Sequence, residues 1–410
     1  MKLNLLSKNS QNKLSTTISV IGLGYVGLPL AISAAQSGYA VYGIDIDQVK
    51  VDLIKSGKSP VEDISDSEIQ NAISGKLKVG SEFSPISDSS IVIICVPTPL
   101  DVDRKPDLSL IDAAVKSFAK HLSMSTLVIL ESTVQPGTTR DYLVSLISKY
   151  SALTPSDFNV AYSPERIDPA NRKWNLKNTP KIVAGLNPIA TKQTKDFYSK
   201  FVDNIVDCES PEVAELAKLL ENTFRYINIS FINELSMFCR SFGVDVNQVI
   251  AAASTKPYGF MPFYPSIGVG GHCIPVDPLY LAATAKKLGV QTRFIDLADE
   301  INTQMPNYFL KVAKEKIGGL QGKKVLVIGV SYKPNVADVR ETPVEALIFG
   351  LRKEGAHVFW HDDLVMEWND EKSSPLDQGY DLAILATPHD YLNLKQIGNT
   401  PLINTRGSIS

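Results

Sequence analysis

Short apolar runs alternate with helix-like segments along the first half of the chain. The β-branched run Ile18–Ile21 predicts a strand that ends in glycines. An apolar-periodic segment then predicts a helix to about Gln36, where Ser37 and Gly38 stop it. The run Ala40–Ile44 predicts the next strand, so these elements together predict a βαβ unit.

Further strand-like runs follow in the same part of the chain. They comprise Ser90–Val96, Thr126–Glu131, Asn159–Tyr162 and Lys181–Ala184. Helical segments lie between them, and this alternation predicts a parallel, doubly wound sheet. The apolar runs are far shorter than the roughly 20 residues that a membrane-spanning helix needs.

Near Ser210 the pattern changes to one long helical period. Ser210 can cap a helix, Pro211 suits its first turn and Gly243 can end it, with a further helical part to about Ala253. The apolar positions on this helix are Val213, Leu216, Leu220, Phe224, Ile227 and Phe231. Such a stripe either forms a dimer interface or packs within one domain, and the pattern does not decide between them.

A second α/β unit begins near residue 318. Residues 318–363 predict a strand, a glycine turn, a helix and a strand, and Asp381–Ala386 and Leu402–Asn404 predict further strands. We therefore expect an α/β protein in which two Rossmann-like, doubly wound domains are joined by a central helical domain with one long helix.

Composition agrees with a globular protein of two or three domains. The chain has 410 residues, of which 44% are hydrophobic and 21% are charged. Its net charge of −3 is spread along the chain and gives no support to nucleic-acid binding through bulk charge. The start has no apolar core long enough for a signal peptide, so we expect a cytoplasmic protein.

The motif GLGYVG at residues 22–27 follows the first predicted strand and opens the helix. Gly22 permits a tight turn, Gly24 lets a pyrophosphate approach the backbone, and Gly27 lets helix and strand pack closely. Asp45, at the end of the second strand, can hydrogen-bond a ribose 2′-OH and repels the 2′-phosphate of NADP. NAD is therefore the expected cofactor.

The four cysteines have neither metal-site spacing nor the spacing of a disulfide framework. They are Cys95, Cys208, Cys239 and Cys273. In a reducing compartment they stay thiols unless chemistry uses them. Cys273 lies in the segment GVGGHCIPVDP, residues 268–278, whose glycines remove side chains around the thiol. We therefore expect another group to approach this loop closely.

Candidate catalytic groups lie in three other segments. Glu131–Val134 ends a strand, and the carboxyl ends of such strands face the ligand crevice. Glu165 follows another strand and is either a catalytic base or a surface glutamate in a salt bridge. Lys218 and Asn222 share one helix face, which is either functional or a solvated polar stripe.

Cys273 is the strongest nucleophile candidate. An unperturbed thiol has a pKa of about 8.5, and backbone N–H groups or Lys218 can favour the thiolate. Asp277 lies four residues on and can exchange protons, whereas His272 is not assigned as the base because neighbours in an irregular loop need not point together. A cysteine of this kind suggests a reaction in four steps. An alcohol is oxidised to an aldehyde, the thiolate adds to the aldehyde, a second oxidation gives a thioester, and water hydrolyses it. An alcohol is thus converted to a carboxylate with two NAD per turnover.

Seven segments, in this order, resemble the UDP-glucose/GDP-mannose dehydrogenase family along nearly the whole chain. They are GLGYVGLPLA, VPTPL, ESTVQPGTT, SPERIDP, ELAKLLENTFRYINISFINEL, GVGGHCIPVDP and SYKPNVADVRETP. The resemblance implies an NAD domain over residues 1–207, a central dimerising domain over 208–312 and a UDP-sugar domain over 313–410. It implies C6 oxidation of a nucleotide sugar by a homodimer. Residues 1–16 are expected to be a mobile extension, because this start is polar and rich in serine. No metal site is expected, because His272 has no obvious partner ligands in the sequence.

The resemblance also implies roles for single residues. Its catalytic positions are Cys273, Lys218, Asn222, Asp277, Glu165 and Thr133. Its NAD positions are Gly22, Gly24, Tyr25, Val26, Gly27, Asp45, Lys50, Pro97, Thr98, Thr133 and Arg340. Its substrate positions are Glu165, Arg166, Lys218, Asn222, Tyr264, Gly270, Lys333 and Arg406.

The substrate is expected to be an N-acetylated UDP-hexosamine. TKPYGFMPFYPSIGVGGHCIP and ERIDPANRKWNLKNTPKIVAG resemble the members that oxidise UDP-N-acetylglucosamine for bacterial surface polysaccharides. The arginine that UDP-glucose members carry before the cysteine has no clear counterpart, and Lys256 and Tyr264 are candidate replacements. UDP-glucose, UDP-N-acetylgalactosamine and UDP-N-acetylmannosamine remain alternatives, as do a one-step hydroxy-acid dehydrogenase and a non-catalytic NAD-binding paralogue.

Overall fold

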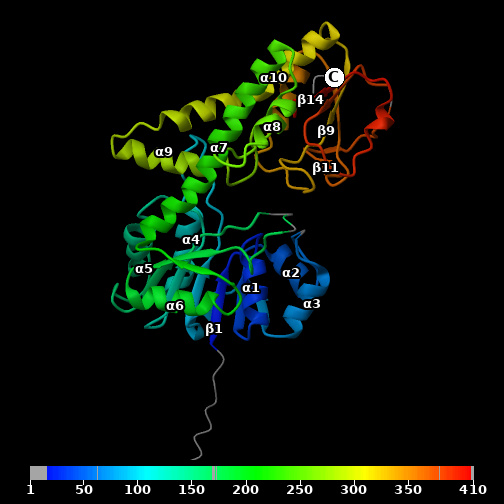
Figure 1. The fold of residues 1–410 in the computed structure, drawn as a ribbon. Coiled ribbons are helices and arrows are strands. Elements are labelled where there is room, and N and C mark those ends of the chain that lie inside the picture. The colour runs from blue at the N-terminus through cyan, green and yellow to red at the C-terminus, as the bar shows by residue number, and fades with distance from the viewer. Residues whose placement is uncertain (1–15, 62, 169–170, 172, 378, 408–410) are drawn as a thin grey trace, which may run out of the picture. The chain divides into compact units, whose positions relative to one another are not determined.

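The computed structural model describes residues 16–61, 63–168, 171, 173–377 and 379–407. The extension predicted at residues 1–16 lies outside the described residues except for Thr16. The chain divides into two compact units (Figure 1). The first unit comprises residues up to 97, 108–132 and 137–214, and the second comprises 98–107, 133–136 and 215–410.

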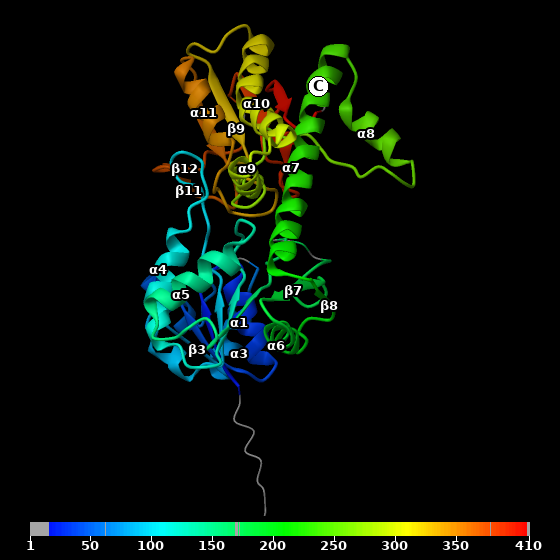
Figure 2. The same ribbon diagram turned by 90° about the vertical axis from the view of Figure 1, so that its left-hand side faces the viewer.

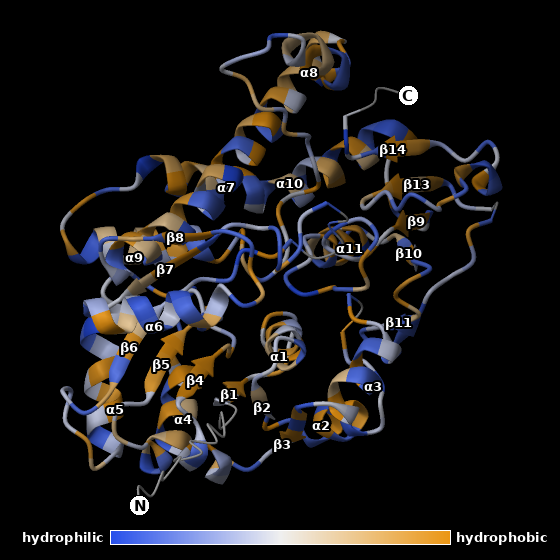
Figure 3. Ribbon diagram, turned by 60° about the horizontal axis from the view of Figure 1, so that its bottom comes forward, coloured by the Kyte–Doolittle hydropathy of each residue, from blue (hydrophilic) through white to orange (hydrophobic). Residues whose placement is uncertain are grey.

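The first unit is built on an eight-stranded sheet in the order β3-β2-β1-β4-β5-β6-β7-β8. Its strands are β1 (Thr17–Ile21), β2 (Ala40–Ile44), β3 (Leu77–Gly80), β4 (Ile91–Ile94), β5 (Leu127–Leu130), β6 (Asn159–Tyr162), β7 (Lys181–Gly185) and β8 (Ile205–Asp207). Its helices are α1 (Gly27–Gln36), α2 (Gln48–Lys55), α3 (Asp66–Ser74), α4 (Ser109–Phe118), α5 (Val144–Tyr150) and α6 (Pro188–Tyr198). The central strands β4 and β5 are hydrophobic throughout and fully buried, as expected for a sheet covered on both faces (Figure 3).

The strand directions confirm the predicted parallel sheet from β3 to β6 and correct it at one pair. β7 runs antiparallel to β6, with Tyr162 opposite Ala184, and β8 is again parallel to β7. An antiparallel neighbour needs no helical crossover, and residues 163–180, which join the two strands, contain no helix in their described part. A run of apolar residues does not show the direction of its strand, so the sequence pattern could not predict this reversal.

The second unit combines long helices with a smaller parallel sheet of order β10-β9-β13-β14. Its helices are α7 (Pro211–Phe242), whose first turn belongs to the first unit, α8 (Val246–Ser254), α9 (Asp277–Lys287), α10 (Arg293–Ile317) and α11 (Val344–Lys353). Its strands are β9 (Lys324–Ile328), β10 (His357–His361), β13 (Leu382–Leu385) and β14 (Leu402–Asn404), with a separate hairpin of β11 (Glu367–Trp368) and β12 (Glu371–Lys372).

The predicted long helix is confirmed as α7, which runs as one continuous ribbon (Figure 2). Ser210 accepts a hydrogen bond from the N–H of Val213, and Gly243 ends the helix in the left-handed region at φ +80°. The sequence pattern did not predict α10, which contains Pro306 in its interior. Because proline usually ends or kinks a helix, its presence in the sequence argues against one continuous helix over this range. None of the helices in the described part of the chain is long and apolar enough to span a membrane.

We expect Gly27→Ala to destabilise the first unit because there is no room for its Cβ. A Cβ on Gly27 would lie 1.8 Å from the carbonyl oxygen of Gly22, so the tight packing of α1 on the β1 turn would have to open. We predict a loss of about 2 kcal/mol or more in the free energy of unfolding, measured by urea titration. Gly24→Ala is the matched control, because a Cβ there meets no heavy atom within 4 Å. Equal unfolding midpoints for the two variants would contradict the packing argument.

Candidate functional site

The turn between β1 and α1 has the features that a dinucleotide pyrophosphate requires. Gly22 adopts φ +90°, and a Cβ on it would lie 2.7 Å from the carbonyl oxygen of Cys95. The space beside Gly24 is open, so its backbone can be approached closely. α1 begins at Gly27 and has no side-chain cap at Val26. The residues therefore fit the phosphates of NAD at a helix N-terminus.

Asp45 follows β2 and is buried beside this turn. Its Oδ2 accepts hydrogen bonds from the N–H of Leu23 at 2.8 Å and from the Lys50 ammonium at 2.8 Å, and its Oδ1 accepts one from the N–H of Asp47 at 3.0 Å. Asp45 therefore also holds the glycine turn. Lys50 is paired with Asp45, so the structure brings these two predicted NAD residues together beside the turn.

The other predicted NAD residues belong to different local structures. Pro97 ends a segment of the first unit, whereas Thr98 and Thr133 belong to the second, where the Thr98 hydroxyl donates to the Thr133 carbonyl at 2.8 Å. Arg340 donates to both carboxylate oxygens of Asp338, which hold its guanidinium.

The N-terminus of α9 brings together three of the predicted catalytic residues. The carbonyl of Cys273 accepts a hydrogen bond from the N–H of Asp277 at 2.8 Å, which places the two residues on one turn. The Asn222 amide on α7 donates to Oδ2 of Asp277 at 2.5 Å. Lys218, one helical turn before Asn222, is also buried. The alternative of a solvated polar stripe is therefore wrong for this face of α7.

The glycine loop before Cys273 packs against two segments of the C-terminal part. A Cβ on Gly270 would lie 2.7 Å from the carbonyl oxygen of Glu341, and a Cβ on Gly271 would lie 2.8 Å from the Tyr332 ring. The Gly271 N–H also donates to the Arg340 carbonyl at 3.1 Å. The close approach expected for this loop is therefore made by Tyr332 and the Glu341 carbonyl of the same chain. The packing of Tyr332 on this loop was not predicted, because no local pattern pairs two loops so far apart in the chain.

His272 is held in its neutral form within this loop. Its Nδ1 is buried and has no hydrogen-bond partner among the residues that the structure describes. Burial, together with the positive charges of Arg340 and Lys218, lowers the pKa of His272 from 6.5 to about 4, although Asp338 opposes the shift. A neutral imidazole with an unsatisfied nitrogen provides no charge to Cys273.

Glu165 and Arg166 lie in the first unit, in the segment that follows β6. The Arg166 guanidinium donates to the Pro180 carbonyl at 2.6 Å. A second group of buried polar side chains lies next to this segment and consists of Glu131, Lys181 and Tyr198. Glu131 was expected near the ligand crevice from its place at the end of a strand, whereas Lys181 and Tyr198 were not predicted to belong to a site.

The predicted UDP-sugar residues differ in their surroundings. The carbonyl of Lys333 accepts a hydrogen bond from the Ser331 hydroxyl at 3.0 Å. Arg406 is largely buried, which lowers its pKa, and its carbonyl accepts a hydrogen bond from Asn247 at 2.9 Å. Tyr264 is exposed, and Lys256 lies over the ring of Tyr258 at 5.0 Å. The contacts of Lys256 and Tyr264 do not mark either as the replacement for the missing arginine.

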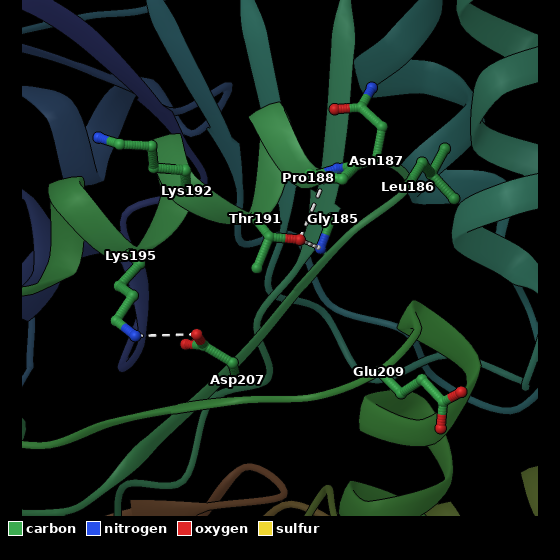
Figure 4. Close-up of a pocket in the computed structure, with 9 residues that line it drawn as sticks. All are labelled: Gly185, Leu186, Asn187, Pro188, Thr191, Lys192, Lys195, Asp207 and Glu209. Atoms are coloured by element: carbon green, nitrogen blue, oxygen red, sulfur yellow. Dashed lines mark hydrogen bonds and ion pairs between the residues drawn. The ribbon is translucent and has the colours of Figure 1, made fainter.

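A surface hollow on the first unit contains none of the predicted site residues (Figure 4). It is lined by Gly185, Leu186, Asn187, Pro188, Thr191, Lys192, Lys195, Asp207 and Glu209. Lys195 is paired with Asp207 at 2.8 Å, and Lys192 is paired with Asp196 at 2.5 Å. Both lysine charges are therefore already balanced. Among the described residues, no group of His, Cys, Asp and Glu side chains could hold a metal ion.

Three family models match the chain in succession. The NAD binding domain of the UDP-glucose/GDP-mannose dehydrogenase family matches residues 16–202, the central domain matches 212–304 and the UDP binding domain matches 326–407. The three matches together cover most of the chain and confirm the resemblance predicted from its motifs.

Individual relatives are similar over nearly their whole length. UDP-N-acetyl-D-glucosamine 6-dehydrogenase of Salmonella typhi is 33% identical over 399 residues, which cover 93% of this chain and 91% of the relative. UDP-N-acetyl-D-mannosamine dehydrogenase of Pyrococcus horikoshii is 35% identical over 379 residues, which cover 91% and 89%. The solved structure of a UDP-D-ManNAc dehydrogenase from Pyrococcus horikoshii has a TM-score of 0.88 and 34% identity and covers 95% of each chain.

We expect His272 to make folding stability depend on pH between about 6.5 and 4. Because its pKa is lower in the folded state, the unfolded chain binds the proton first, and stability falls as the pH drops through this window. Between pH 7 and pH 5, wild type should lose about 2 kcal/mol more unfolding free energy than His272→Gln.

Urea unfolding at the two pH values measures this difference. His357→Gln is the matched control, because His357 is exposed on β10. If wild type and His272→Gln lose the same unfolding free energy, His272 is not kept neutral by the fold.

Proposed function

The chain belongs to the UDP-glucose/GDP-mannose dehydrogenase family, and we propose that it oxidises C6 of a UDP-N-acetylhexosamine to a carboxylate with NAD. The observation that carries the proposal is the turn that holds Cys273 and Asp277, with Asn222 bonded to Asp277 and the buried Lys218 on the same helix. These are the groups that a thioester route requires. A one-step hydroxy-acid dehydrogenase needs no such cysteine.

UDP-N-acetylglucosamine is the substrate that we propose first. It follows from the two segments that resemble the N-acetylglucosamine branch, and one relative is named for this activity. Another relative of similar identity is named for UDP-N-acetylmannosamine, which is therefore the second candidate. UDP-N-acetylgalactosamine and UDP-glucose remain further alternatives, and the product would serve as a precursor of bacterial surface polysaccharide.

The cofactor would be held by the turn between β1 and α1. Gly22 and Gly24 would admit the pyrophosphate, and Asp45 would accept a hydrogen bond from the adenosine ribose. When bound, NAD supplies a hydride acceptor for each of the two oxidations. The ion pair between Asp45 and Lys50 places a cation close to the ribose position as well.

In the first half of the reaction, the C6 alcohol would lose a hydride and a proton to give the aldehyde, and the Cys273 thiolate would add to its carbon to form a thiohemiacetal. The buried Lys218 ammonium stabilises the negative charge that develops on the sugar oxygen, and the Asn222 amide helps to orient it. Asp277 holds the Asn222 amide by a 2.5 Å hydrogen bond and exchanges a proton with the substrate oxygen. Loss of hydride from the thiohemiacetal then leaves a thioester on Cys273.

In the second half, water would cleave the thioester, giving the carboxylate, two protons and the Cys273 thiolate. Glu165 takes a proton from this water, and Thr133 helps to place it. Overall, one alcohol, two NAD⁺ and one water yield one carboxylate, two NADH and three protons. The thioester bond forms and breaks within one turnover, so Cys273 returns to its starting state.

The exposed face of α7 supports a homodimer. Leu220 and Phe231 are 64% and 60% exposed, whereas Lys218, Asn222 and Asn233 on the opposite face are buried. An apolar stripe on the outer face of a helix in a single chain marks a protein interface. Of the two interpretations of the sequence pattern, we therefore propose the dimer interface.

The first test is NADH release at 340 nm with a panel of UDP-sugars, together with the amount of sugar consumed. We expect two NADH per sugar and the highest kcat/KM with UDP-N-acetylglucosamine. If two NADH are released per sugar but another UDP-sugar is preferred, the proposed mechanism stands and the proposed substrate is wrong. One NADH per sugar, or none with any sugar, would remove the thioester mechanism.

Cys273→Ala provides the internal control for that assay. The variant should bind NAD as wild type does, because the β1–α1 turn is unchanged, but it should form no acid. Continued acid production would show that the sulfur is not the nucleophile.

We expect Leu220→Asp to convert a dimer to a monomer. A carboxylate in the centre of the apolar stripe would be desolvated in the interface, whereas it stays in water on a monomer. Sedimentation velocity measures the change. Leu288→Asp, an exposed leucine at the end of α9, is the matched control and should leave the dimer intact. A wild-type monomer, or a dimeric Leu220→Asp variant, would contradict the proposed interface.

A further inference from the structure

Three buried polar side chains form a closed network in the first unit. Glu131 directly follows β5, Lys181 begins β7 and Tyr198 ends α6. The Glu131 Oε2 and the Lys181 Nζ are 3.1 Å apart, and the Tyr198 hydroxyl donates to the other carboxylate oxygen. All three side chains are almost completely shielded from water. Burial and the neighbouring Glu131 carboxylate raise the pKa of Tyr198, so its hydroxyl stays protonated and can donate.

The Lys181 ammonium makes three contacts. One is with Glu131, and a second is with the ring face of Tyr198, 4.7 Å from its centroid. In the third, the ammonium donates to the carbonyl of Pro164 at 3.2 Å. That carbonyl belongs to the residue before Glu165, so the network reaches the backbone of the proposed catalytic glutamate.

The reversed direction of β7 brings the lysine to this place. In a parallel sheet the first residue of a strand lies at the edge opposite to the carboxyl ends of its neighbours. Because β7 is antiparallel to β6, Lys181 lies at the edge where β5 ends in Glu131 and β6 leads into Pro164. This edge of the sheet is where ligands bind in doubly wound folds.

The segment around Glu165 is tied to the start of β7 at three successive points. The Ser163 hydroxyl donates to the Ile182 carbonyl at 2.9 Å, and the Arg166 guanidinium donates to the Pro180 carbonyl at 2.6 Å. The bond from Lys181 to the Pro164 carbonyl lies between them. Since the peptide group is planar, holding the Pro164 carbonyl also sets the direction in which the Glu165 backbone leaves.

Stability alone does not explain why these charges are buried. The desolvation of a buried ion pair offsets most of its attraction, and apolar replacements of similar volume are often as stable. We propose that the Glu131–Lys181 pair, with the Tyr198 hydroxyl bonded to Glu131, positions the loop that carries Glu165. It acts on hydrolysis of the thioester through the Pro164 carbonyl and does not touch substrate or NAD. This inference rests on the role of Glu165 given under the proposed function.

The test compares a variant of the pair with a variant of Glu165 and with their combination. Glu131→Gln/Lys181→Met removes both charges together, so no uncompensated charge is left in the interior. We expect kcat to fall by about a hundredfold, the size of effect that a displacement of about 1 Å can produce. NAD affinity, measured by fluorescence titration, should stay unchanged. Intact-protein mass spectrometry after acid quench should show the sugar thioester accumulating.

The combination shows whether the pair acts through Glu165. In a Glu165→Gln background, the pair substitution should cause little further loss of kcat, because its effect depends on the group already removed. A full additional loss would overturn the inference, and so would a pair variant with wild-type kcat. Lys195→Met is the matched control, since this lysine lies on α6 near Tyr198 but is half-exposed and paired with Asp207. It should have wild-type kinetics.

Failure of the inference and failure of the proposed function give different results. If wild type does not release two NADH per sugar, the proposed function fails before the variants are compared. If wild type does so while the losses simply add, only the positioning role fails. Should the pair variant not fold, Tyr198→Phe removes only the hydroxyl that holds Glu131. It should lower kcat in wild type but not in the Glu165→Gln background, and an equal loss in both would overturn the inference.

Discussion

The second unit depends on the close contact between the glycine loop at 268–271 and the segments at Tyr332 and Glu341. No side chain fits at Gly270 or Gly271, because Tyr332 and the Glu341 carbonyl occupy the space that a Cβ would need. The loop is joined at its start to the long helices, where Asn233 accepts the Ser266 N–H and donates to Asn302. The same few residues therefore connect the helical layer, the proposed nucleophile and the loop that carries Lys333.

α7 serves this arrangement because its polar face is the buried one. Buried polar groups must be paired to be tolerated, and Asn222 and Asn233 each have a hydrogen-bond partner. The apolar stripe with Leu220 and Phe231 lies on the outer face. In an ordinary surface helix the two faces would be exchanged. A second protein surface over the apolar face would remove it from water, which is the arrangement that the proposed dimer provides.

The sequence predicted the elements well and their mutual relations less well. Runs such as Ile18–Ile21 lie in strands, and the cap at Ser210 and the end at Gly243 mark the long helix, because these signals are local. The direction of β7 and the packing of Tyr332 on the glycine loop are not local, so no pattern showed them. The helical spacing of the apolar residues on α7 was predicted correctly, but this spacing does not show which face of the helix is buried. For the same reason Lys181 and Tyr198 were missed, since they meet Glu131 only in the folded sheet.

The two units share the chain in an interleaved way. The backbone passes from one unit to the other at five places, after residues 97, 107, 132, 136 and 214. The short segments 98–107 and 133–136 leave the first sheet and return to it, although they belong to the second unit. Arg104, for example, forms a bidentate pair with Asp299 on α10. A gene cut at residue 214 would therefore yield a C-terminal piece without these two inserts, so the two units would have to be inherited, exchanged and engineered as a single piece.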